Sequence, residues 1–240
     1  MRYLVKISYD GSNFYGFQRL NDERSVQKVL EDALTIINNN SVEVKGAGRT
    51  DKGVHAYGQR VHFDLDIILP KDNLKKALND ILPDDIRIEE VQEVDNDFHA
   101  RFNVIKKVYQ YKINVGKYDP LKHNYYYQVD YDIDIKKLEE CKKELLGAHN
   151  FHNFVSGERD NYDAIIYDID INKENDIITI TFTGKSFYRY MVRNMVGAML
   201  DVAINKSNLD NLKEMLKEDV DKQMSCAPAC GLYLMEIYYE

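Results

Sequence analysis

Residues 2–9, Arg2-Tyr3-Leu4-Val5-Lys6-Ile7-Ser8-Tyr9, decide the fold class because they open the chain with a strand. Their alternation places Tyr3, Val5, Ile7 and Tyr9 on one face. Residues 10–13 (Asp-Gly-Ser-Asn) predict a turn. Ser25 then predicts the N-cap of an amphipathic helix, whose apolar stripe is Val26, Val29, Leu30, Ala33, Leu34 and Ile37. The chain therefore begins as strand, turn and helix.

The same patterns continue to the C-terminus. Further strands are predicted at residues 42–44, 60–66, 86–94, 108–115, 164–171, 177–183 and 232–239. Asp72 predicts the N-cap of a second helix that ends before Pro83, and more helices are predicted at 135–146, 187–204 and 209–216. This order lacks a regular β-α-β repeat, so it favours an α+β fold with a mixed, largely antiparallel sheet and helices packed on it. The halves divide near residues 103–107, which gives subdomains 1–104 and 105–240.

Composition is typical of a globular protein with a substantial core. A chain of 240 residues buries roughly 70% of its unfolded surface, without needing a metal or disulfide. No apolar run is long enough to span a membrane, and the N-terminus is too short and charged for a signal peptide. The three cysteines (Cys141, Cys226, Cys230) suit a reducing cytoplasm and have no zinc-ligand spacing. We expect a cytoplasmic protein with no metal site.

Positive charge gathers in three windows, although the chain has a net charge of −8. Residues 45–62 carry a net +3, residues 101–117 carry +5 and residues 184–194 carry +3. If these windows converge in the fold, they form a basic surface suited to a polyanion. If they lie on separate faces, the clustering has no function, and charge alone leaves both interpretations open.

One glycine-rich stretch, residues 47–55 (Ala-Gly-Arg-Thr-Asp-Lys-Gly-Val-His), carries a single carboxylate, Asp51. The spacing matches neither a phosphate-binding loop nor a dinucleotide fingerprint, so no nucleotide cofactor is expected. Glycines let the backbone turn sharply beside a ligand, while Arg49 and Lys52 favour the charged form of Asp51, which suits a nucleophile. Alternatively, Asp51 only organises a turn.

Two further groups qualify as site residues. Arg193 lies within the nearly all-apolar helix predicted at 187–204, one turn after Arg189, and a guanidinium there needs an anionic partner such as Asp51 unless it extends to the surface. Tyr109 and Tyr111 share a strand face close to Lys106 and Lys107. Tyrosines beside cations are suited to base stacking, although two core tyrosines fit the pattern as well.

Several short motifs, taken in their order along the chain, resemble those of the TruA family of tRNA pseudouridine synthases, and they extend over nearly the whole sequence. The motifs are residues 9–12 with 14–18, 24–27, 48–55, 98–102, 109–111, 191–194 and 227–229 with 231–234. Two departures are Phe17, where the family often has tryptophan, and Lys52, where alanine is frequent. Neither removes a group that the chemistry needs.

The resemblance implies a pseudouridine synthase fold with a central active-site cleft. It assigns the catalytic roles to Asp51, Tyr109 and Arg193 and implies RNA contacts by Arg49, Lys52, Lys106, Lys107 and Arg189. It also implies isomerisation of uridine to pseudouridine at positions 38 to 40 of the tRNA anticodon stem-loop, on a flipped uridine, by a homodimer without cofactor. Two rivals stay open: a non-catalytic RNA-binding protein on this scaffold, and a synthase that modifies ribosomal RNA.

Overall fold

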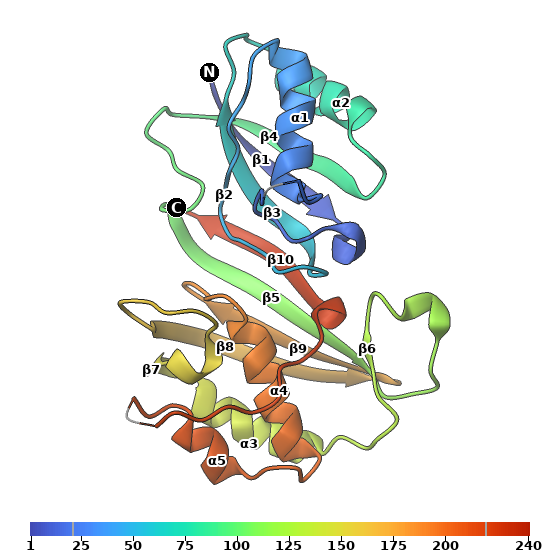
Figure 1. Cartoon of the computed structure of the whole chain (residues 1–240), viewed down its shortest axis with the longest axis vertical. Coiled ribbons are helices and arrows are strands. Elements are labelled where there is room, and N and C mark those ends of the chain that lie inside the picture. The colour runs from blue at the N-terminus through green and yellow to red at the C-terminus, as the bar shows by residue number, and fades with distance from the viewer. Residues whose placement is uncertain (21, 219) are drawn as a thin grey trace. The chain divides into compact units, whose positions relative to one another are not determined.

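The computed structural model describes residues 1–20, 22–218 and 220–240. It forms two compact units, which are Met1–Ile105 with Leu234–Glu240, and Lys106–Tyr233 (Figure 1). The sequence-based division places the last seven residues in the C-terminal subdomain. In the structure they belong to the first unit, because strand β10 (Leu232–Tyr239) lies beside β3 there and Glu236 forms ion pairs with Lys6 and Arg60.

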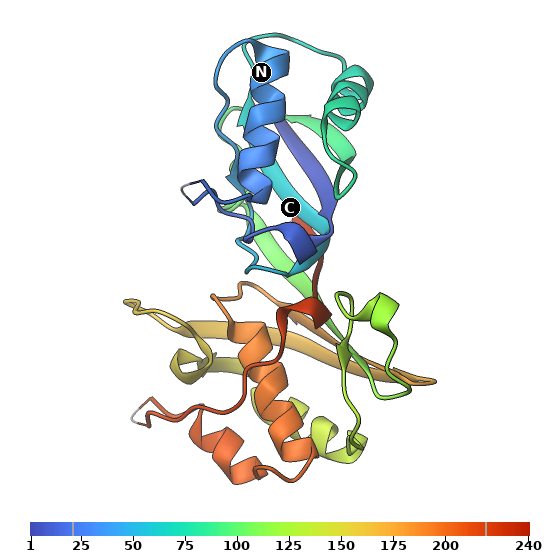
Figure 2. The ribbon, with the colours of Figure 1, turned by 45° about the vertical axis from the view of Figure 1, so that its right-hand side comes forward.

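The first unit is a sheet with two helices on one face. Its strands follow the order β4-β1-β3-β10, where β1 is Arg2–Tyr9, β3 is His55–Asp64 and β4 is Ile86–Val94, and β1 pairs antiparallel with both β3 and β4. Helices α1 (Val26–Asn38) and α2 (Lys71–Ile81) cover one face (Figures 1 and 2). The alternating side chains of β1 predicted for that face are all buried.

The two helices begin differently from one another. Ser25 caps α1 as predicted, and its hydroxyl accepts a hydrogen bond from the Lys28 amide at 3.3 Å. The predicted cap of α2 is wrong: Pro70 occupies the N-cap position without a side-chain hydrogen bond, and Asp72 lies in the first turn. There its carboxylate still stabilises the helix through the helix dipole.

The strand predicted at residues 42–44 is also wrong, because the paired segment is β2 (Lys45–Gly46), which lies against β3. Val42 and Val44 are buried as the apolar pattern predicted. However, the Val44 amide donates to the Glu31 carboxylate at 3.2 Å, and its carbonyl accepts from the Gln27 amide group at 3.0 Å. Side chains of α1 therefore satisfy the backbone that a ladder would otherwise pair.

A turn at residues 96–103, which we call the 96–103 turn, is fastened to this unit. Arg2 donates to the Phe98 carbonyl at 2.9 Å, and the Tyr239 hydroxyl donates to the Ala100 carbonyl at 2.8 Å. The Ala100 amide donates to Nδ1 of His62 at 3.0 Å. Three separate strands thus hold the turn in place.

The second unit is a sheet in the order β5-β9-β8-β7. These strands are β5 (Val104–Asn114), β9 (Ile177–Gly184), β8 (Asp163–Glu174) and β7 (Gly147–Asn150), and their neighbours pair antiparallel. A short strand, β6 (Tyr127–Gln128), pairs parallel to β5. Three helices complete the unit: α3 (Ile135–Leu145), α4 (Met191–Ala203) and α5 (Leu209–Glu214). The predicted α+β class with a mixed, largely antiparallel sheet is confirmed.

Helix α4 is shorter than predicted at its N-terminal end. It begins at Met191 because Tyr190 adopts a left-handed conformation with φ +63°, which a right-handed helix excludes. Arg189 therefore precedes the helix and does not lie one turn before Arg193 on the same face, as the sequence suggested. The helix is otherwise buried nearly all round, as predicted.

Among the helices in the part of the chain that the structure describes, none contains the long apolar stretch that a membrane span requires.

Gly197 of α4 tests how closely this helix packs. A Cβ there would lie 1.8 Å from the carbonyl oxygen of Ser225. Alanine in a helix is more favourable than glycine by about 1 kcal/mol, but forced overpacking costs about 1–3 kcal/mol. We expect Gly197→Ala to lower the free energy of unfolding in urea titrations, whereas Lys143→Ala, an exposed change on α3, leaves it within about 0.5 kcal/mol. A stabilised Gly197→Ala would contradict the close packing.

The buried His62 is expected to make the stability of the protein sensitive to acid. Burial, together with the nearby His99, Arg2 and Lys45, lowers its pKa from 6.5 to about 4, although Asp64 opposes this shift. The unfolded chain therefore binds more protons between these pH values, so stability rises with pH. We expect about 1–2 kcal/mol to be lost as the pH falls from 6.5 to 4, a value that allows for solvent screening of the ring. His62→Gln should flatten this part of the stability profile, whereas the exposed His123→Gln should not.

Candidate active site

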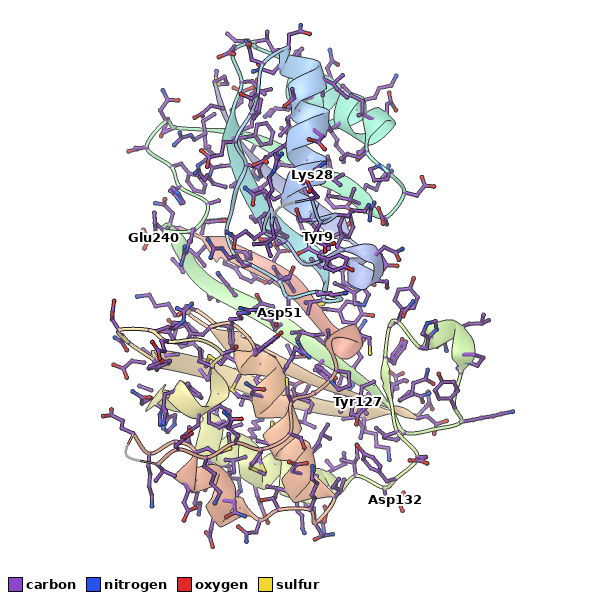
Figure 3. All side chains as sticks on the ribbon, in the orientation of Figure 1. Tyr9, Lys28, Asp51, Tyr127, Asp132 and Glu240 are labelled. Atoms are coloured by element: carbon purple, nitrogen blue, oxygen red, sulfur yellow. The ribbon has the colours of Figure 1, made fainter. Side chains whose placement is uncertain are left out.

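Asp51 lies on the loop between β2 and β3 in the first unit, and Figure 3 labels it together with Tyr9. Its side chain is half-buried, while its basic neighbours Arg49 and Lys52 are exposed. The Val54 amide donates to the Asp51 carbonyl at 3.1 Å and closes a turn around the carboxylate. The predicted loop with one carboxylate between two cations is therefore present.

Residues 9–17 form a second loop that backs the Asp51 loop. The Phe17 amide donates to the Thr50 carbonyl at 3.1 Å, and the Gly53 amide donates to the Phe14 carbonyl at 3.4 Å. Gly16 has φ +93°, and a Cβ there would lie 2.7 Å from the Thr50 oxygen. Only glycine fits a position with this dihedral angle and this backbone approach.

Side chains from β1 and β3 also hold the Asp51 loop in place. The Tyr9 hydroxyl lies 2.8 Å from the Thr50 hydroxyl, and the Gln59 amide donates to the Gly48 carbonyl at 2.9 Å. Burial raises the pKa of Tyr9 to about 12, against hydrogen bonds with Thr50 and Gln59 that lower it. The phenol therefore stays neutral at physiological pH and can act as a hydrogen-bond donor.

His55 contacts the segment that follows β1 through one ring nitrogen. Its buried ring accepts the Gly11 amide proton at Nδ1, at 3.0 Å. The same nitrogen lies 3.2 Å from a carboxylate oxygen of Asp10, so both neighbours of His55 belong to the segment that follows β1. His55 thus joins the residues 9–17 loop to the end of the Asp51 loop.

Lys52, the residue next to Asp51, contacts an aromatic ring. Its ammonium lies 3.7 Å from the centroid of Tyr15, a partly exposed side chain of the backing loop. This cation–π contact stabilises the lysine at the surface. The Lys52 ammonium is therefore held beside Tyr15, at the surface of the Asp51 loop.

Tyr109 lies on β5 in the second unit, opposite Phe182 of β9. It is 7% exposed, and its ring meets that of Phe187 edge-to-face at 5.2 Å between centroids. Tyr111 on the same strand face is fully buried, and its hydroxyl donates to the Pro228 carbonyl at 2.7 Å. Burial raises the pKa of Tyr111 well above its usual value, so Tyr111 has the environment of a core tyrosine.

Arg193 lies on the first turn of α4. The Arg193 Nε donates to the Ala227 carbonyl at 2.8 Å, and the Ala227 amide donates to the Arg193 carbonyl at 3.0 Å. The Arg193 guanidinium lies 4.7 Å from the centroid of the Tyr190 ring. A cation at a helix N-terminus is opposed by the helix dipole. The position therefore does little for the helix and suits the binding of an anion.

The remaining predicted RNA contacts differ in exposure. Arg189 is exposed and lies 5.2 Å from the centroid of Tyr190, and Lys106 is half-buried. Lys107 is only 8% exposed within β5, and its expected phosphate contact stays a prediction. It lies on a paired strand, so the charge count along the sequence could not reveal its burial.

Several supporting residues were not singled out by the sequence analysis. Tyr9 was placed only on a strand face and within a motif, Gly16 appeared only within a motif, and Gln59 and Ala227 had no assigned role. Their partners lie 11 to 41 residues away, so no local spacing could reveal them. Among the described residues, no three His, Cys, Asp or Glu side chains are grouped as metal ligands.

Comparison with known proteins agrees with these motifs. A family model described as tRNA pseudouridine synthase matches residues 6–103 and 142–240. The chain is 37% identical over 246 residues to "tRNA pseudouridine synthase A" of Bacillus subtilis, covering 100% of both chains. It is 40% identical over 246 residues to the protein of the same name from Listeria monocytogenes serovar 1/2a, covering 100% of this chain and 99% of the relative.

Among solved structures, the chain matches one titled "Crystal Structure of a Cbf5-Nop10-Gar1 Complex" at 12% identity and a TM-score of 0.34, over 83% of this chain and 54% of that chain. The match to the family model and the full-length similarity to these two relatives show that this chain belongs to the tRNA pseudouridine synthase family, and it is an isomerase of that kind.

Proposed function

We propose that this protein isomerises uridine to pseudouridine at positions 38 to 40 of the anticodon stem-loop of tRNAs, with Asp51 as the nucleophile on a flipped uridine. The full-length similarity to proteins named tRNA pseudouridine synthase A supports tRNA as the substrate. The anticodon position rests on the family resemblance of the sequence motifs. By the same resemblance the enzyme acts as a homodimer without a cofactor, and its cysteine content suits a reducing cytoplasm.

The geometry of the Asp51 loop is the observation that carries the nucleophile assignment. Backbone hydrogen bonds to residues 14–17 and side chains of β1 and β3 fix the residues around Asp51. Its own side chain keeps partial exposure between two exposed cations. A rigid backbone with an accessible carboxylate is what nucleophilic attack requires.

The reaction needs no redox partner. The N1–C1′ glycosidic bond breaks, the base turns, a C5–C1′ bond forms, C5 releases a proton and N1 gains one, so atoms and charge balance. A uridine in a stem must first leave the stack, which costs a few kcal/mol. Asp51 attacks at C1′ of the ribose or by a related route on the base.

The other residues support this chemistry. Tyr109 holds the flipped base and takes the C5 proton, and Arg193 supplies a guanidinium for an anion. Arg49, Lys52, Lys106 and Arg189 contact phosphates, which positions the RNA without reading its sequence. The exposure of Arg49, Lys52 and Arg189 favours these contacts. Lys107 belongs to the same proposed group, although it is only 8% exposed.

Asp51→Asn should abolish turnover because an amide cannot act as the nucleophile. We expect less than a few per cent of the wild-type rate of tritium release from tRNA labelled at C5 of uridine. Affinity for tRNA should stay close to that of the wild type. Ser41→Ala, an exposed change in the same unit, serves as the control. Residual turnover above that level would sink the nucleophile assignment.

Binding to tRNA should weaken steeply with salt, because each neutralised phosphate releases counterions. We expect log K to fall linearly with log[salt], and Arg49→Ala or Arg189→Ala to reduce the slope by about one. Fluorescence anisotropy with labelled tRNA between 50 and about 200 mM salt measures this. A flat response would rule out a phosphate-binding surface.

Tritium release also separates the two rivals. Protein that binds tRNA but releases no tritium from any RNA would be a non-catalytic RNA-binding protein. Release from ribosomal RNA alone would identify a different target. Chemical mapping of pseudouridine in the tRNA product then tests positions 38 to 40.

A further inference from the structure

Phe102, at the tip of the 96–103 turn, is a large apolar side chain left in solvent. It is 76% exposed. The reaction proposed above assigns it no role, although its segment was singled out as a motif of the sequence. Exposure alone does not set Phe102 apart, because Ile68 is exposed to the same degree; its backbone and its neighbouring rings do.

The turn holds Phe102 rigidly. The Phe102 amide donates to the His99 carbonyl at 3.1 Å, the Arg101 amide donates to Nδ1 of His99 at 3.1 Å, and the His99 amide donates to the Asn103 side chain at 2.8 Å. The Ala100 amide is fastened to His62, as described above. A ring on so constrained a backbone loses little conformational entropy when it binds.

Three rings form a stack that ends in Phe102. The buried His62 meets His99 edge-to-face at 4.6 Å between centroids, and His99 meets Phe102 at 4.2 Å with an interplanar angle of 31°. His99 therefore supports one face of the Phe102 ring. The high exposure of Phe102 leaves room for another flat ring on its outer side.

Cations act on the His99 ring of this stack, while the carboxylates of Asp64 and Asp97 act on Arg2. Arg101 is exposed, and its guanidinium lies 6.0 Å from the Phe102 centroid. Within residues 1–20, 22–218 and 220–240, no carboxylate forms an ion pair with Arg101. Burial and the charges of Arg2, Lys45 and Arg101 lower the pKa of His99, which indicates that these cations act on the same spot. A flat, supported ring beside an available cation matches an unpaired nucleobase with its phosphate.

We infer that Phe102 is a stacking platform for an unpaired base of the RNA substrate, and that Arg101 contacts the adjoining phosphate. The identity of the RNA rests on the proposed function. The contact is an accessory one: it binds RNA and takes no part in bond making.

Tryptophan fluorescence tests this inference directly because the protein contains no tryptophan. F102W places a single reporter on the stack, and I68W places one at a site of matching exposure, 77%, in the same unit. Stacking on a base should quench the F102W signal when unmodified tRNA is added. I68W with tRNA, and F102W with a fully paired RNA duplex, should show no such quenching.

Affinity provides the second measurement. We expect Phe102→Ala to weaken tRNA binding roughly 5- to 100-fold, because removing a base-stacking aromatic has an effect of this size. F102W should retain wild-type affinity, and Ile68→Ala should change nothing. Circular dichroism and thermal melting of each variant show that the fold is kept.

The outcomes separate this inference from the proposed function. If the wild type releases no tritium from tRNA, the proposed function fails, while quenching of F102W by tRNA would still establish the stacking contact. If the wild type is active but Phe102→Ala binds tRNA normally and F102W is not quenched, only the inference fails. Dissociation of a dimer by Phe102→Ala, without loss of RNA affinity, would identify a contact between protein copies and would also overturn it.

Discussion

The close approach between the backbone of Gly16 and that of Thr50 is the constraint on which the candidate site depends. It joins two loops separated by more than thirty residues, and it leaves no room for a side chain at position 16. The surrounding hydrogen bonds, from Phe17 and Gly53 in the backbone to Tyr9 and Gln59 in the strands, follow from that approach. Asp51 thereby has a fixed backbone although it lies in a loop.

The first unit uses the two faces of its sheet differently. One face packs against α1 and α2 and supplies the hydrophobic core. The other carries ion pairs, such as those of Glu236 with Lys6 and Arg60, and holds the 96–103 turn. The buried His62 belongs to this second face, so acid sensitivity and the presentation of Phe102 have the same structural origin.

In the second unit, the segment that contains Ala227 and Pro228 contacts both α4 and β5. It accepts hydrogen bonds from Arg193 and from Tyr111, and the tight packing at Gly197 brings the preceding residues against α4. The left-handed Tyr190 starts the helix where Arg193 falls on its first turn. An arginine that sequence pattern places in the middle of a helix therefore lies at its positive end, where an anion binds most favourably.

The sequence by itself determined the α+β class, the bounds of β1, β4 and β10, the Ser25 cap and the motifs that identify the family, because these depend on local periodicity, capping and residue order. Tertiary structure decided the rest. Glu31 and Gln27 satisfy the backbone of Val44 in place of a strand partner, Tyr190 shortens α4, and pairing within β5 buries Lys107. Each of these depends on contacts between residues far apart in the chain, or on a backbone angle that tertiary packing imposes, and a local pattern carries no information about either.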